Sequence, residues 1–106
     1  MSISERYRQA LNQIEQEADR LYETLPESTA KALRFVDMAV EELQDWAESV
    51  GEIPQLQLDS KLSPVLLKVH GQLDRARVLL EKDEHHEAGK KVWDLEQMIY
   101  RLLNDL

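Results

Sequence analysis

The chain has 106 residues, 42% hydrophobic and 32% charged, so it is long enough for one continuous core and we expect a single domain over residues 1–106. Its formal net charge of −8 makes direct binding to nucleic acid or to anionic lipid electrostatically unfavourable. The lack of cysteine excludes disulfides, thiolate metal sites and cysteine nucleophiles, and it is typical of a protein kept in a reducing cytoplasm.

The amino-terminal residues 1–6 contain no apolar run behind a basic start, so we expect no signal peptide. Uninterrupted apolar stretches such as residues 65–67 are far too short to cross a membrane. These features predict a cytoplasmic protein without a membrane partner.

The first predicted helix runs from Ile3 to Thr24, because apolar or small residues recur there every three or four positions and so share one helical face. Ser2 followed by Glu5 matches a capping box, in which the two side chains bind free amides of the first turn. Pro26 ends this helix, because proline donates no helical hydrogen bond and forces the preceding residue out of the α conformation.

The second predicted helix follows a turn at residues 25–28 and continues to Val50. Its apolar stripe is widened on one flank by alanine and aromatic residues, so we expect this helix to contact two neighbours. Gly51 is predicted to end it in a left-handed conformation, with Pro54 preventing the helix from resuming.

Residues 51–62 form the longest predicted connection, a strap whose apolar side chains cross the end of the bundle. Ser63 and Pro64 are a favourable start for the third helix, a capping oxygen followed by a preset dihedral angle. Leu62 and Leu67 have the spacing of a hydrophobic staple across that start.

The third and fourth helices show the same alternation of three and four residues between apolar positions. This period predicts an all-α fold, a four-helix bundle of two antiparallel helical hairpins joined by a longer strap. The two stripes are Leu62, Leu66, Val69, Leu73, Ala76 and Leu80, then Ala88, Val92, Leu95, Ile99, Leu102 and Leu106.

Charge is divided unevenly among the helices. Residues 27–50 hold six acidic and two basic residues, whereas residues 63–82 hold four basic and two acidic ones. The opposite signs favour placing the second and third helices side by side, although each exposed pair contributes only about 0.2 to 1 kcal/mol.

Histidines and carboxylates crowd together only at residues 81–87. Asp83 and His86 have the Asp-x-x-His spacing of a metal-binding helix, but the motif occurs once and at a helix junction, so we expect no metal and no other cofactor. An acidic first turn favoured by the helix dipole explains the same residues.

His85 is the basis of one alternative function, a phosphate-carrying histidine domain, because such domains are four-helix bundles of similar size with one exposed imidazole. Gly89, Lys90 and Lys91 follow it, but not in the family's His-x-x-Lys-Gly order. A further alternative is an inhibitor that mimics nucleic acid with the acidic residues of positions 27–50.

Large apolar residues away from the stripes suggest a different kind of site. Trp93 and Tyr100 are seven residues apart and share an outward face, with Leu103 between that face and the core, while Leu67 and Val78 lie opposite the stripe of the third helix. Aromatic rings lapping over the edge of a small bundle would explain them equally well.

No catalytic, nucleotide-binding or nucleophile motif is present, so we expect no enzymatic activity. The leading hypothesis is a non-enzymatic cytosolic protein–protein interaction module, an adaptor, small chaperone or inhibitor, that binds another protein or its own copy as a homodimer.

Overall fold

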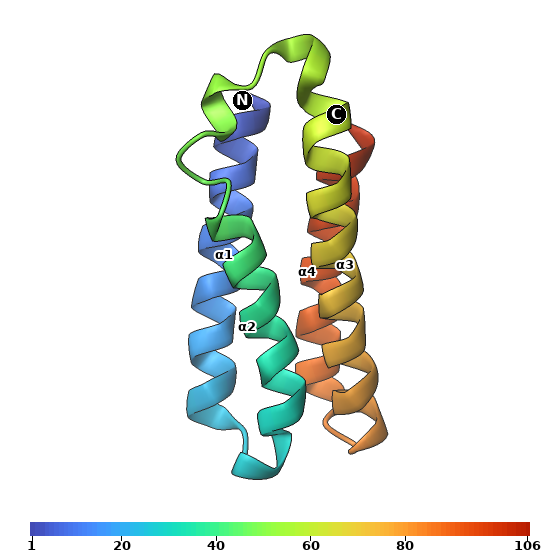
Figure 1. Cartoon of the computed structure of the whole chain (residues 1–106). Coiled ribbons are helices and arrows are strands. Elements are labelled where there is room, and N and C mark those ends of the chain that lie inside the picture. The colour runs from blue at the N-terminus through green and yellow to red at the C-terminus, as the bar shows by residue number, and fades with distance from the viewer.

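A computed structural model describes all residues 1–106 and contains four α-helices and no strand. The helices run alternately up and down, which confirms the all-α bundle of two antiparallel hairpins (Figure 1). None of them combines the length and the apolar character needed to cross a membrane. Their bounds are α1 Ile3–Thr24, α2 Ala30–Gln44, α3 Leu58–Lys82 and α4 His86–Asn104.

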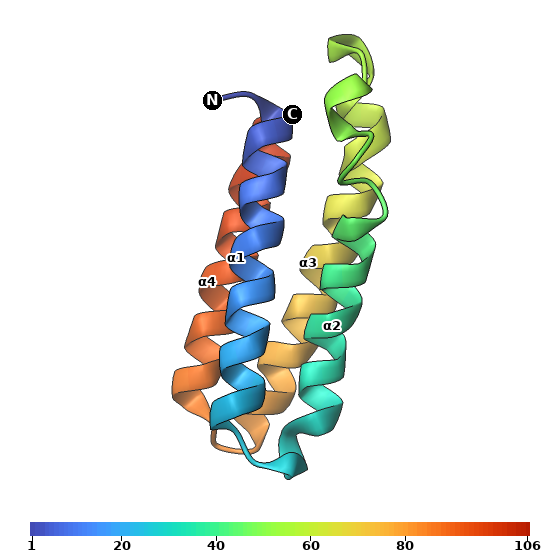
Figure 2. The same cartoon turned by 90° about the vertical axis from the view of Figure 1, so that its left-hand side faces the viewer.

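The bundle is elongated, 43 × 21 × 20 Å, and both chain ends lie at the same end of it (Figure 2). Arg6 of α1 and Asp105, just after α4, form an ion pair of 2.8 Å there. This contact closes the ring of helices, because it joins the first helix to the last.

Helix α1 begins and ends where its capping residues and Pro26 predict. Helix α1 has the predicted bounds, and its capping box is present, with the amide of Glu5 donating to Ser2 Oγ at 3.1 Å. Pro26 ends the helix as expected. A short 3-10 turn, Glu27–Thr29, then leads into α2.

The core is a single cluster of 24 buried apolar residues drawn from all four helices and from the connection at the top of the bundle. Every predicted stripe position of α3 is buried, and so is every one of α4 as far as Leu102. A spacing of three and four residues matches the 3.6-residue helical turn, which explains why the buried faces were predictable.

The predicted end of the second helix is wrong. Helix α2 ends at Gln44, and the chain continues through turns into a 3-10 segment, Val50–Glu52. Gly51 belongs to that segment and does not adopt a left-handed conformation. The apolar pattern continues past Gln44 because Val50 is still buried, but the backbone that carries it is no longer an α-helix.

Contacts from α1 account for this early end. The buried hydroxyl of Tyr7 donates to the carbonyl oxygen of Leu43 at 2.6 Å, and Arg8 Nε donates to the carbonyl oxygen of Ala47 at 3.1 Å. Carbonyl groups at the end of a helix need such partners. Side chains about 40 positions away in the sequence supply them here, so no local signal marks the end.

The predicted start of the third helix is also wrong. Helix α3 begins at Leu58, so Ser63 and Pro64 lie inside it and the connecting segment ends before residue 58. Leu62 is in the helix and Leu67 is exposed, which rules out the proposed staple. Burying Leu58 and Leu62 along one stripe extends the helix upstream, although Pro64 removes the hydrogen bond of its own amide and its ring crowds the carbonyl four residues earlier.

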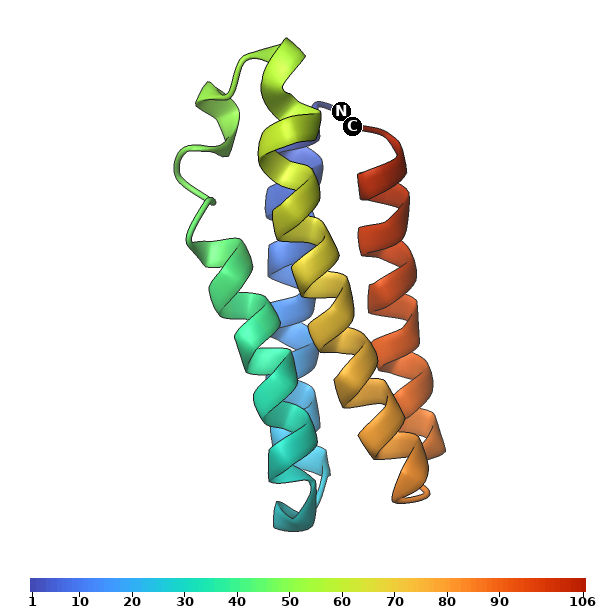
Figure 3. The same cartoon turned by 45° about the vertical axis from the view of Figure 1, so that its right-hand side comes forward.

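Helix α3 lies between α2 and α4, as Figure 3 shows. The predicted adjacency of the acidic and basic helices is therefore confirmed. Only one ion pair joins them, Lys68 Nζ to Glu42 Oε2 at 3.2 Å. Charge contributes little to this contact, and apolar burial accounts for most of it.

The turn between α3 and α4 contains the one non-glycine residue with a positive φ, Glu84 at 66°. The amide of Glu84 donates to the carbonyl of Glu81 at 3.0 Å, and that of His85 to the carbonyl of Leu80 at 2.8 Å. These two bonds define a Schellman motif, in which glycine is the usual residue at the left-handed position.

Replacing Glu84 by glycine is therefore expected to stabilise the fold by about 1 kcal/mol, because glycine enters the left-handed region without the steric strain of a Cβ. Urea unfolding measures this change. The matched control is Glu15→Gly inside α1, where the same substitution is expected to lower the free energy of unfolding by about 1 kcal/mol. A destabilised Glu84→Gly variant would contradict the assignment of strain to this turn.

Candidate functional site

The aromatic pair on α4 lies on the surface of the bundle. Trp93 is 42% exposed and Tyr100 is 50% exposed. The ammonium of Lys90 lies 4.9 Å from the centroid of the Trp93 ring, and the Tyr100 ring lies 6.4 Å from that of His70 on α3. Both rings are thus partly supported by neighbours from the bundle, and each keeps a large face open to solvent.

The other three predicted interface residues fall in two environments. Leu103 is partly buried against the core, as expected for a position between the aromatic face and the stripe. Leu67 and Val78 on α3 are 59% and 47% exposed. They are 11 residues apart, about three helical turns, so they share one face of α3.

Val78 of α3 and the aromatic pair of α4 border different features of the surface. Val78 borders a hollow between α2 and α3, on the side of α3 away from α4. Tyr100 borders the seam where α3 meets α4, because its ring lies beside His70, and charged residues line that seam. We call Trp93, Tyr100 and the exposed part of Leu103 the α4 surface.

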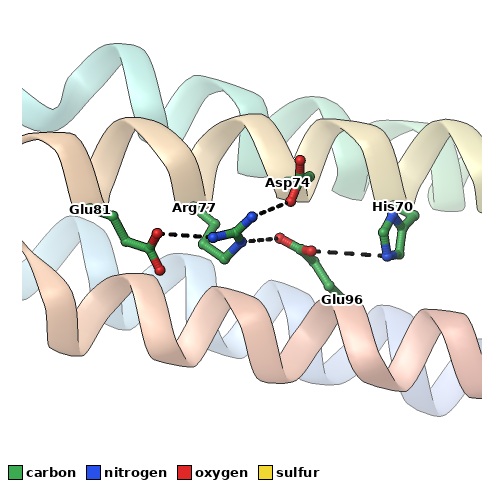
Figure 4. Close-up of polar contacts among 5 residues, drawn as sticks. All are labelled: His70, Asp74, Arg77, Glu81 and Glu96. Atoms are coloured by element: carbon green, nitrogen blue, oxygen red, sulfur yellow. Dashed lines mark hydrogen bonds and ion pairs between the residues drawn. The ribbon is translucent and has the colours of Figure 1, made fainter.

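Five polar or charged side chains line the seam between α3 and α4, and we call them the polar cluster. Figure 4 shows Arg77 at the centre of the cluster, with its guanidinium turned toward three carboxylates. The members from α3 recur every three or four residues and so face α4 together. They are His70, Asp74, Arg77 and Glu81 of α3, and Glu96 of α4.

Arg77 holds the polar cluster together through all three of its guanidinium nitrogens. Nη2 donates to Asp74 Oδ1 at 2.7 Å, Nη1 to Glu81 Oε2 at 2.9 Å, and Nε to Glu96 Oε1 at 3.3 Å. Only the last of these contacts joins α3 to α4. A planar guanidinium is suited to this task because its five donors point in fixed directions.

Glu96 is the most deeply buried charged residue, with 3% of its surface exposed. Its other oxygen, Oε2, lies 3.9 Å from His70 Nε2. Burial raises the pKa of Glu96 to about 7, the negative charge of Asp74 adds to this effect, and Arg77 opposes it. Asp74 behaves in the opposite way, because its hydrogen bond from Arg77 lowers the pKa of its carboxyl.

Gly89 allows the two helices to approach closely at the lower end of the seam. A Cβ atom at this position would lie 2.8 Å from Cγ of Glu81, which is closer than van der Waals contact permits. Glu81 is held in place by Arg77. Close packing of α3 against α4 therefore requires a glycine at position 89.

Sequence reasoning missed the polar cluster. The signal that would have found it is the phase of Glu96, which follows Val92 by four residues and precedes Ile99 by three, so it lies on the flank of the buried stripe. A charged residue at such a position needs a partner of opposite charge. Arg77 has the matching phase on α3.

His85 and His86 line a pocket of about 520 Å³ at the turn end of the bundle, together with Lys91. Glu84 and Glu87 line the same pocket, and their charges disfavour the approach of a phosphoryl donor. No group of three or more potential metal ligands is gathered here or elsewhere in the chain.

The polar cluster can exchange a proton near neutral pH and can align α3 with α4, whereas the α4 surface offers two aromatic rings for contact with another molecule. Comparison with known proteins finds no matching family model, no matching curated protein and no matching solved structure.

Proposed function

We propose that this protein is a non-enzymatic interaction module that binds a second copy of itself through the α4 surface. The observation that carries this proposal is the exposure of Trp93 and Tyr100, 42% and 50%, on a helix whose opposite face already contributes a full stripe to the core. The absence of cysteine supports a cytoplasmic location for it.

Energetics support a protein partner for these rings. Covering apolar surface stabilises a complex by about 25 cal/mol per Å², and tryptophan and tyrosine are the residues most often found at the energetic centre of interfaces. The two rings are two helical turns apart and point the same way, so a flat or helical partner can contact both at once. A two-fold homodimer needs only this one surface, because the patch serves both subunits.

Sedimentation equilibrium of the wild type beside a Trp93→Ala, Tyr100→Ala double variant tests the proposal. We expect a wild-type dimer whose dissociation constant rises at least about 800-fold in the double variant, because buried interface aromatics contribute about 2 kcal/mol or more each and two of them are removed. Leu56→Ala is the matched control, since Leu56 is almost fully exposed on the segment that joins α2 to α3. It is expected to leave the dissociation constant unchanged.

Fluorescence gives an independent measurement of the same contact. The chain has two tryptophans, so a Trp46→Phe background leaves Trp93 as the only one. Its emission is expected to shift to shorter wavelength as the protein concentration passes through the dissociation constant. A monomer at every concentration, with Trp93 emission that does not change, would refute the homodimer.

A further inference from the structure

A groove runs along the bundle between α2 and α3, and Asp74 is the one member of the polar cluster that borders it. It consists of two adjoining hollows of about 310 and about 300 Å³, which share Phe35 and Arg75. We call it the α2–α3 groove. The apolar side chains that line it are Phe35, Met38, Val78 and Leu79.

Gly71 lies in the groove and has no structural explanation within the chain. It is in the interior of α3, where glycine lowers helix stability relative to alanine. A Cβ atom built on it would meet no other atom within 4 Å, in contrast to Gly89, where a Cβ would collide with Glu81. Space left open at a helix interior is what close approach of another molecule requires.

Gln72 is a second observation that points to an occupant. It lines the same hollow as Gly71, is only 9% exposed, and its Oε1 atom has no hydrogen-bond partner. A buried acceptor without a donor is unfavourable in a folded protein. A donor from a bound molecule would remove this defect once the amide turns toward the groove.

The charges along the groove indicate the chemistry of the occupant. Lys31 on α2 and Arg75 on α3 have no acidic partner, and the Arg75 guanidinium lies 5.8 Å from the centroid of the Phe35 ring. Asp74 also borders the groove, but Arg77 binds its carboxylate. Lys31 and Arg75 therefore leave two positive charges beside the apolar floor of the groove, and these charges are complementary to acidic side chains of an occupant.

We propose that the α2–α3 groove binds an amphipathic helix of a partner protein, with its apolar face on Phe35, Met38 and Val78 and its acidic residues beside Lys31 and Arg75. From Lys31 to Met38 the groove follows α2 for about 10 Å, or two turns. That length fits apolar anchors at positions i, i+3 or i+4, and i+7 of a bound helix. This inference goes beyond self-association, because it concerns a different face and a different partner.

The test uses a fluorescein-labelled helical peptide of about 14 residues, with leucines at i, i+3, i+4 and i+7 and glutamates on both flanks. We expect fluorescence anisotropy to show saturable binding to the wild type. The same peptide with lysines in place of the glutamates is expected to bind at least about tenfold more weakly. Amide NMR signals of Phe35, Gly71 and Gln72 should shift in the titration.

Gly71→Leu separates binding from folding. Leucine fills the open space and favours the helix, so we expect the thermal midpoint to rise by about 4 °C or more while the acidic peptide binds at least about tenfold more weakly. A Lys31→Glu, Arg75→Glu variant is expected to reverse the preference between the two peptides. The Trp93→Ala, Tyr100→Ala variant should bind the acidic peptide like the wild type, because its changes lie outside the groove.

Three results would overturn the proposal. They are equal affinity for the acidic and basic peptides, unchanged peptide binding by Gly71→Leu, and a Gly71→Leu variant that loses self-association while no peptide binds the wild type. The last result would assign the groove to a second copy of this chain. Loss of peptide binding leaves the test of the α4 surface unaffected, so the two proposals fail independently.

Discussion

Replacing Leu73 by alanine is expected to lower the free energy of unfolding by about 2 to 5 kcal/mol. Leu73 lies at the middle of α3, is fully buried, and belongs to the 24-residue core. The loss has two parts, the transfer free energy of the removed methyl and methylene groups and the cavity that the neighbouring helices fail to fill. For a domain of this size, a loss in that range removes a large share of the total stability.

Leu67→Ala is the matched control, because it makes the same substitution in the same helix at a side chain that is 59% exposed. Its effect is expected to stay within about 0.5 kcal/mol. Urea unfolding followed by circular dichroism measures both variants, with the slope of the transition as a check on two-state behaviour. If the two variants were equally damaged, the assignment of buried and exposed faces on α3 would be wrong.

Replacing Glu96 by glutamine is expected to give a variant whose free energy of unfolding, relative to that of the wild type, changes by about 2 to 4 kcal/mol between about pH 5 and about pH 8. The ordinary pKa of a glutamate carboxyl is 4.5, and burial raises that of Glu96 to about 7 in the folded protein. Between these two values the folded state holds a proton that the unfolded state has released. Stability therefore falls as the pH rises through this interval.

Glutamine does not titrate, so the variant does not lose stability through this group. Its free energy of unfolding relative to that of the wild type is therefore expected to increase as the pH rises. Glutamine keeps an oxygen that can accept from Arg77 Nε, which preserves the link between α3 and α4. Arg77 and Asp74 carry their charges throughout this interval, and the other titratable neighbour is His70, whose Nε2 lies 3.9 Å from Glu96 Oε2. The measurement is therefore repeated in a His70→Gln background.

Glu48→Gln provides the control for this experiment. Glu48 is exposed, and its replacement removes one carboxylate from the chain without touching the polar cluster. It accounts for the general effect of lowering the negative charge of the protein. If the Glu96→Gln variant had the same pH profile as the wild type, the pKa of the Glu96 carboxyl would be the same in the folded and unfolded states. The upward shift of that pKa on folding would then be wrong.

The two proposed contact surfaces lie on different sides of α3. The α4 surface is separated from the α2–α3 groove by the polar cluster and by the outward face of α3 itself. Variants that test one surface therefore leave the other intact. This separation also means that a dimer formed through α4 keeps its grooves open to a second partner.

The helical period, the capping box of α1 and the break at Pro26 were readable directly from the residues, whereas the signals at Gly51, Ser63 and Pro64 were misleading. The stripes of α3 and α4 are buried where the spacing placed them, and α1 begins and ends at the predicted residues. These features depend on neighbours within four positions along the chain. The exposure of Trp93 and Tyr100 followed from the same period, because their phase differs from that of the stripe.

Tertiary contacts decided the rest. The end of α2 depends on Tyr7 and Arg8 of α1, which bind carbonyl groups that a local reading leaves without partners. The start of α3 depends on the burial of Leu58, whose gain outweighs the disturbance of a proline inside the helix. In each case the deciding free energy comes from another helix, which the local pattern does not contain.

The polar cluster and the α2–α3 groove also depend on tertiary contacts between helices. Spacing alone places Glu96 beside the stripe, but only the packing of α3 against α4 shows that Arg77 meets it and that water is excluded from it. Likewise, a glycine at position 71 reads as a mild weakness of the helix until the neighbouring α2 turns the space beside it into a groove. A sequence determines which residues share a face, whereas burial, charge pairing and open space depend on which faces meet.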